Sequence, residues 1–142
     1  MEHNNITVTL KLINDLVEKK ANSELGKYNI TLSQARILAA LFNSKADNLS
    51  LKALEKLFNV SQATMQGTIS RLNKKGFVDV SCLPNDKKTK YVSLTHDVKL
   101  LVGSISKCIG DVNRSMTENL TNEELDEFYR IMTKMYTSLK EK

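Results

Sequence analysis

Two short amphipathic segments separated by a two-residue break constrain the fold of this chain most strongly. Apolar side chains recur at helical spacing within residues 50–58, and Ser50 stands where a helix N-cap would lie. After the break, Ser61 can cap a second helix over residues 62–75, and Gly76 can end it. This pattern predicts a helix-turn-helix, whose second helix can enter the major groove of DNA.

The second predicted helix has one apolar face and one face of small and polar side chains. Met65, Ile69 and Leu72 fall on the apolar face, which we expect to be buried. The cap and the opposite face carry the residues that we predict to lie against DNA, namely Ser61, Gln62, Ala63, Thr64, Gln66, Gly67, Ser70 and Arg71.

Three of these residues are the main candidates for reaching DNA. Gln62 and Gln66 carry amides that can pair with N6 and N7 of adenine, and Thr64 can contact a phosphate or a thymine methyl group. The alternative is an exposed polar face that contacts nothing. Ser61 suits a phosphate contact, as does Arg71, although Arg71 could instead pair with an acid inside the fold. Ala63 and Gly67 would allow close approach to the groove.

Two β-rich runs follow the second helix and predict a hairpin. They span residues 77–83 and 89–94, and a turn-rich basic tip over residues 84–88 separates them. A helix-turn-helix followed by such a hairpin is a winged helix, and Leu49 could supply a short third strand. The candidate DNA contacts here are Ser50 for the DNA backbone and, on the wing, Asp86, Lys87, Lys88 and Lys90.

The positive charge of the chain gathers in the same segment. Residues 61–90 hold six basic and two acidic side chains, out of a total net charge of +5. A basic run by itself is more often a solvated face. Its coincidence with the predicted reading helix and wing favours a polyanionic partner, which would release counterions on binding.

Four motifs, in this order, resemble the multiple-antibiotic-resistance-regulator (MarR) family of bacterial transcription factors. They are VSQAT, RLNKKGFV, PNDKK and VSLT, which begin at Val60, Arg71, Pro84 and Val92. The resemblance extends over nearly the whole chain. It implies a mainly α fold with a small β wing, in a single domain over residues 1–142. Residues 30–95 would form the DNA-binding part, and residues 1–25 and 96–142 would form long dimerisation helices.

The resemblance also implies a function. It predicts a homodimeric regulator that binds a pseudo-palindromic operator in double-stranded DNA, most often as a repressor. A small, frequently aromatic effector would bind between the dimer helices and the reading domain. Tyr28 and Arg36 lie near that expected crevice, but a core or surface role is favoured for each.

Two further features follow from comparing the wing and reading helix with the family. In the family, an aspartate and the second residue after it, usually arginine, commonly brace the wing by a salt bridge. Asp86 and Lys88 match those positions, which implies a structural role for Lys88 and a minor-groove role for Lys87. Family members often carry larger side chains at the position of Gly67, so its presence departs from the pattern.

The two ends of the chain are predicted to be amphipathic helices. Apolar residues repeat at helical spacing within residues 5–25, and a helix capped by Thr95 is expected to run to about Glu118. Thr121 and Glu124 form the pattern of a capping box for a last helix. Because a small winged helix cannot cover these apolar stripes, they are predicted to form the dimer interface through Ile6, Leu10, Ile13, Leu125, Phe128, Met132, Met135 and Leu139.

Other classes of function lack support in the sequence. There is no phosphate-binding glycine loop, nucleophile elbow or HExxH motif, and neither a cofactor nor a metal is expected. The cysteines Cys82 and Cys108 are expected to pack in the core. No membrane-spanning run and no signal peptide are seen, so a cytoplasmic protein is expected. The main alternative to a DNA-binding regulator is a winged helix that binds another protein.

Overall fold

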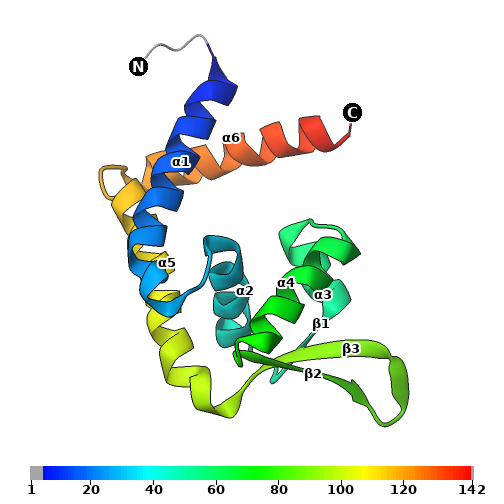
Figure 1. The fold of residues 1–142 in the computed structure, drawn as a ribbon. Coiled ribbons are helices and arrows are strands. Elements are labelled where there is room, and N and C mark those ends of the chain that lie inside the picture. The colour runs from blue at the N-terminus through cyan, green and yellow to red at the C-terminus, as the bar shows by residue number, and fades with distance from the viewer. Residues whose placement is uncertain (1–4, 142) are drawn as a thin grey trace.

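The computed structural model describes residues 5–141, and it contains the predicted helix-turn-helix, wing and terminal helices (Figure 1). Helix α1 (Ile6–Leu25) begins where the side chain of Asn5 accepts the N–H of Val8. A short 3-10 helix, η1 (Gly26–Tyr28), follows it. Helix α2 (Leu32–Asn43) then starts at a capping box formed by Thr31 and Gln34.

The helix-turn-helix is built as its caps predict. Ser50 accepts the N–H of Ala53 at the start of α3 (Leu51–Phe58), and Ser61 caps α4 (Gln62–Lys74). Asn59 adopts a left-handed conformation in the turn between the two helices, with φ of 51°. Gly76, with φ of 82°, reverses the chain after α4, as glycine does readily. The prediction of this motif is confirmed.

A three-stranded antiparallel sheet forms the wing and its base. Strand β1 (Leu49–Ser50) pairs with β3 (Asp86–Leu94), which pairs in turn with β2 (Val78–Leu83). Leu49 lies opposite Val92, and Val78 lies opposite Leu94. The third strand expected at Leu49 is therefore present.

The tip of the wing differs from the prediction. The turn contains only Pro84 and Asn85, because β3 already begins at Asp86. The strand register shifts between Cys82, which lies opposite Lys90, and Leu83, which lies opposite Asp86. Residues 87–89 consequently form an irregularity within β3, and the first two wing lysines lie on a strand rather than in a loop.

The hairpin also extends beyond the hydrophobic core (Figure 1). Val78, at its base, is buried, whereas Val80 is 40% exposed and Cys82 is exposed. The expectation that Cys82 packs in the core is wrong, since the part of β2 that carries it has no helix against it. Cys108 is half-buried and packs against the core.

The start of the long helix is a second correction. Thr95 caps no helix through its side chain, and a 3-10 helix, η2 (His96–Val98), precedes α5 (Lys99–Thr117). The hydroxyl group of Thr95 instead donates to the carbonyl oxygen of Gly76. The threonine is therefore used to join two segments that are distant in the sequence.

The core lies where α1, α2 and α5 meet α3, α4 and the sheet. Helix α5 packs along α2 and α1, and α3 packs on α4. The buried face of α4 consists of Met65, Ile69 and Leu72, as predicted.

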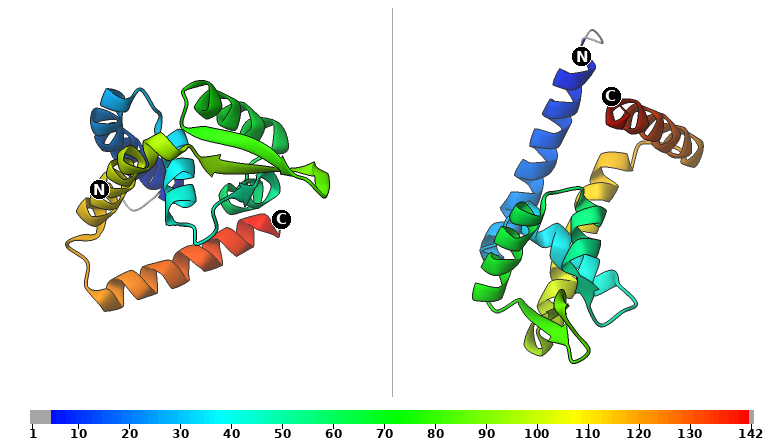
Figure 2. Two further views of the ribbon diagram at one scale, coloured as in Figure 1. Left: turned by 90° about the horizontal axis from the view of Figure 1, so that it is seen from below. Right: turned by 90° about the vertical axis from the view of Figure 1, so that its right-hand side faces the viewer.

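Helix α6 (Asn122–Lys140) runs from the end of α5 as a separate arm (Figures 1 and 2). It begins at the predicted capping box of Thr121 and Glu124, but none of its residues is buried. In α1, only Ala21 and Leu25 are buried, near its C-terminal end. The apolar stripes at both ends of the chain are thus uncovered within one subunit.

The expectations for residues 1–4, including the absence of a signal peptide, fall outside the described residues. Within residues 5–141, no helix is long and apolar enough to cross a membrane. The same part of the chain holds no cluster of three or more His, Cys, Asp or Glu side chains suited to a metal ion.

Candidate nucleic-acid interface

The outer face of α4 presents all the side chains that the sequence predicts for the reading helix. Of the eight candidates from Ser61 to Arg71, only Gly67 is half-buried and the others are exposed. Because Met65, Ile69 and Leu72 hold the opposite face in the core, the helix can rotate little about its axis. The amides of Gln62 and Gln66, one helical turn apart, therefore face outward together.

The first turn of α4 is organised by two hydroxyl groups. The oxygen of Ser61 accepts the N–H of Thr64 at 3.1 Å and its hydroxyl donates to Oγ1 of Thr64 at 2.9 Å. The Ser61 hydroxyl is thus occupied by capping. The hydroxyl hydrogen of Thr64 stays available as a donor on the exposed face. Ser50 is occupied in the same way, by the N–H of Ala53 at the start of α3.

Arg71 lies back along the helix over Gly67. A Cβ atom at Gly67 would be 3.8 Å from both terminal nitrogens of the Arg71 guanidinium group. Arg71 makes no ion pair with any described residue. The alternative of an internal acid partner for Arg71 is therefore not realised, and its charge lies on the reading face.

The wing is braced by backbone hydrogen bonds and not by the expected salt bridge. Oδ1 of Asp86 accepts the N–H groups of Lys88 and Thr89, each at 3.2 Å. The pKa of Asp86 lies below its ordinary value, because the Thr89 side chain and then the two backbone N–H groups favour the ionised carboxylate. Within the described residues Lys88 forms no ion pair with Asp86, so the salt bridge common in the family is absent from this wing.

The basic side chains of this surface are mostly unengaged. Lys87, Lys88 and Lys90 are exposed on β3. Each of the four ion pairs found in residues 5–141 lies on α1, η1, α5 or α6, outside the segment 61–90. This concentration of unpaired positive charge beside the outer face of α4 matches the charge of a phosphate backbone.

The C-terminal end of α4 is tied to three other parts of the fold, which sequence reasoning did not foresee. Asn73 donates to the carbonyl oxygen of Val78 at 2.9 Å, at the base of the wing. The ammonium group of Lys75 donates to Gln34 and Asn29, beyond η1. Thr95 reaches Gly76 from the start of α5. Because these partners are far apart in the chain, no local pattern reveals them.

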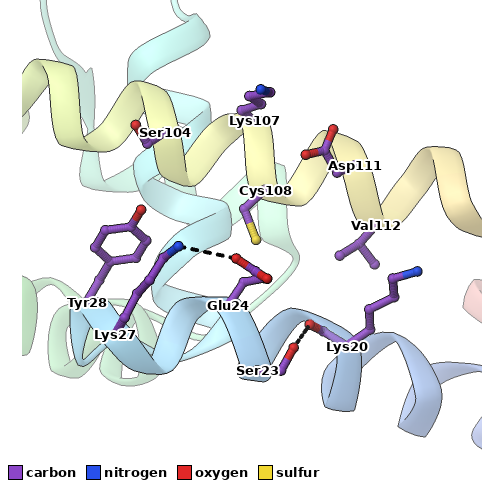
Figure 3. Close-up of a pocket in the computed structure, with 10 residues that line it drawn as sticks. All are labelled: Lys20, Ser23, Glu24, Lys27, Tyr28, Ser104, Lys107, Cys108, Asp111 and Val112. Carbon is purple, nitrogen blue, oxygen red and sulfur yellow. Dashed lines mark hydrogen bonds and ion pairs between the residues drawn. The ribbon is translucent and has the colours of Figure 1, made fainter.

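Two cavities lie between α1 and α5. The first, of about 470 Å³, lies between the end of α1, η1 and α5 (Figure 3). Its lining includes five charged residues, Lys20, Glu24, Lys27, Lys107 and Asp111. Cys108 also lines it, and burial, followed by Glu24 and Asp111, raises the pKa of its thiol.

The second cavity, of about 440 Å³, lies between α1, α2 and α5. Its walls are largely apolar and include Val17, Leu32, Ile109 and Met116. Arg36 is the one charged side chain among the lining residues, and it makes no ion pair within residues 5–141. Tyr28 lines the first cavity instead, so the two candidates for an effector crevice are separated.

The predicted dimer residues are uncovered on the two terminal helices. Ile6 is 63% exposed and Leu139 is 79% exposed, while Leu10, Ile13 and Phe128 are also exposed. Leu125, Met132 and Met135 are half-buried. This apolar area lies on α1 and α6, whereas the candidate DNA contacts lie on α4 and the wing.

Comparison with known proteins agrees with this architecture. The model of the MarR family matches residues 30–90. The HTH-type transcriptional repressor YetL of Bacillus subtilis is 29% identical, with 87% of this chain and 76% of the relative covered. The multiple antibiotic resistance protein MarR of Escherichia coli is 26% identical, with 82% and 80% covered.

Solved structures show the same fold over nearly the whole chain. A MepR–DNA complex of S. aureus has a TM-score of 0.87 at 21% identity, covering 94% of this chain and 98% of that one. A mutant MarR of E. coli complexed with operator DNA has a TM-score of 0.77 at 24% identity, covering 92% of each chain. The chain therefore shares the fold of these structures, and its residues 30–90 match the MarR family model.

Proposed function

We propose that this protein is a sequence-specific, double-stranded-DNA-binding transcriptional regulator that acts as a repressor. The observation that carries the proposal is the outer face of α4, where Gln62, Thr64, Gln66 and Arg71 are exposed beside a wing of unpaired lysines. Amide and hydroxyl groups on a helix suit base edges in the major groove, and the lysines suit phosphates. The similarity to a B. subtilis repressor and to structures with bound DNA supports the same function.

The regulator would act as a homodimer. The apolar stripes of α1 and α6 are uncovered in one subunit, and pairing would remove them from water. Residues 1–25 and 96–142 would then serve dimerisation, and residues 30–95 would serve DNA binding. Two reading helices related by two-fold symmetry require a pseudo-palindromic operator, with half-sites about 10 base pairs apart. A protein with this target would work in the cytoplasm, without a cofactor or a catalytic step.

The apolar cavity between α1, α2 and α5 is suited to a small aromatic acid. Its volume of about 440 Å³ falls in the range of ligand sites, and Arg36 offers an unpaired guanidinium group to a carboxylate. An effector held there would contact α1 and α5, which are proposed to serve dimerisation, and α2, which lies behind α3 and α4. If it binds one spacing of the reading helices more tightly, it shifts the dimer away from the DNA-binding state.

The test of DNA binding is titration of the protein with a duplex from upstream of its own gene, against a scrambled duplex, over a salt series. We expect tight binding to the upstream duplex, weaker binding to the scrambled one, and affinity that falls linearly with salt on logarithmic axes. Failure to bind any duplex at low salt would contradict the proposal and favour the protein-binding module.

The test of the effector site uses benzoate as a probe of the aromatic acids. We expect benzoate to raise the melting temperature and to weaken binding to the operator. Replacing Arg36 with Met should remove both effects, while Lys20→Met, in the first cavity, should leave them intact. Equal responses of the two variants would show that benzoate does not use the apolar cavity.

A further inference from the structure

Lys75 lies one residue beyond the end of α4 and reaches across to the segment between α1 and α2. Its ammonium group donates to the carbonyl oxygen of Asn29 and, at 3.1 Å, to Oε1 of Gln34. These acceptors lie 46 and 41 residues away in the sequence. Lys75 thereby connects the C-terminal end of α4 to the junction between α1 and α2.

The two acceptors are held in place by the backbone around them. Asn29 has a left-handed conformation with φ of 55°, and its N–H donates to the carbonyl oxygen of Gly26. Gln34 is only 5% exposed, and its Oε1 also accepts the N–H of Thr31 in the capping box of α2. Since these groups are positioned without the lysine, they define one location for its ammonium group.

The location of this contact matters because a change in the angle of α4 at its C-terminal end displaces its N-terminal end. The 13 residues of α4 span roughly 20 Å at about 1.5 Å per residue. Gln62 and Thr64, two of the side chains proposed to read DNA, lie in its first turn, at the other end from Lys75. A small change of angle at Lys75 therefore moves the first turn of α4 most. Asn73 and Thr95 tie the same end to the wing and to α5.

We infer that Lys75 is a positioning residue, which sets the angle of the reading helix relative to α1 without contacting DNA itself. This inference rests on the proposed function as a dimeric DNA-binding protein. In such a dimer, the angle between α4 and the dimerisation helix determines the spacing of the two reading helices. Lys75 would then influence binding to a complete operator, which contains two half-sites, and would have little influence on binding to one half-site.

The first experiment compares Lys75→Met with Lys74→Met in the full chain. Lys74 is the matched control, because it is the preceding residue, carries the same charge and is exposed. Lys75→Met should weaken binding to the complete operator by about three- to tenfold, the equivalent of one net hydrogen bond. Binding to a single half-site and the salt slope should stay unchanged.

The outcomes separate this role from two others. A phosphate contact would lower affinity for both duplexes and reduce the salt slope by about one unit per subunit. A role in folding alone would lower the urea midpoint and weaken both duplexes alike. Either result would overturn the inference, as would operator binding by Lys75→Met equal to that of the unchanged protein.

A second experiment tests the partner. Gln34→Glu keeps the capping box and offers Lys75 an ionised acceptor, so it should leave operator binding within about twofold of the unchanged protein. Combined with Lys75→Met, the same change leaves a buried carboxylate without its lysine. The double variant should then lose more operator affinity than the two single variants together, and additive losses would overturn the inference. Absence of DNA binding by the unchanged protein would instead remove the proposed function.

Discussion

The hydroxyl group of Thr95 donates a hydrogen bond of 2.8 Å to the carbonyl oxygen of Gly76. The backbone N–H of Thr95 also donates to the carbonyl oxygen of Phe77, at 3.0 Å. Thr95 precedes η2 and α5, whereas Gly76 and Phe77 connect α4 to the wing. The segment that follows α4 and the segment that precedes η2 and α5 are therefore held together at the base of the wing.

The first prediction concerns this contact. Thr95→Val keeps the shape of the side chain and removes the hydroxyl group, so we expect the free energy of unfolding to fall by about 1 kcal/mol. Urea denaturation measures the change. Thr95→Ser, which keeps the donor, should be affected less. An unchanged urea midpoint for Thr95→Val would show that water replaces the bond without cost.

The second prediction concerns base recognition by Gln62, which is exposed in the first turn of α4. Gln62→Ala should cost on the order of 1–3 kcal/mol at the preferred base pair and relax the preference there. The salt slope should change little, because no charge is removed. Titrations with operator duplexes altered at single base pairs measure the effect. A uniform loss over all of these duplexes would contradict a base contact.

The third prediction concerns Lys87, which is exposed on β3 within the irregular part of the wing. Lys87→Ala should weaken all duplexes to a similar degree and flatten the salt dependence by about one unit per contact, up to about two per dimer. Lys134→Ala, on α6, serves as the control and should leave the slope unchanged. Equal slopes for the two variants would place the wing away from DNA.

The fourth prediction concerns the dimer interface. Met132 lies on the apolar stripe of α6, and replacing it with Glu would place a charge in the proposed contact between subunits. We expect sedimentation at micromolar concentration to show a dimer for the unchanged protein and a larger monomer fraction for Met132→Glu. Lys134→Glu, on the opposite face of α6, should remain dimeric. Unchanged assembly of Met132→Glu would show that the interface lies elsewhere.

The fifth prediction concerns the two cysteines. Burial raises the pKa of the Cys108 thiol, so little of the reactive thiolate is present at neutral pH, whereas Cys82 is exposed on the wing. Iodoacetamide should therefore label Cys108→Ser, which retains Cys82, faster than Cys82→Ser, as followed by mass spectrometry. Equal labelling rates would contradict the difference in environment.

The local elements could be read from the sequence because their signals are local. Ser50, Ser61 and Thr121 each cap the helix that the sequence predicts, since a cap involves residues only three positions apart. The buried face of α4 follows from helical periodicity in the same way. The candidate reading face could be predicted for the same reason, because it is the opposite side of one helix.

The tertiary structure decided the features that depend on contacts between segments distant in the sequence. Cys82 follows Val78 and Val80 at every second position of β2, the pattern of a buried strand face. No helix covers that part of the strand, so Cys82 is exposed. Asp86 stands at the position of a salt-bridge partner, but the backbone of β3 turns two N–H groups toward it. Lys75 looks like one more charge of a basic run, and only folding brings it to Asn29 and Gln34. Caps and periodicity are set by neighbours in the chain, whereas these three environments are set by contacts between distant segments, which no local pattern records.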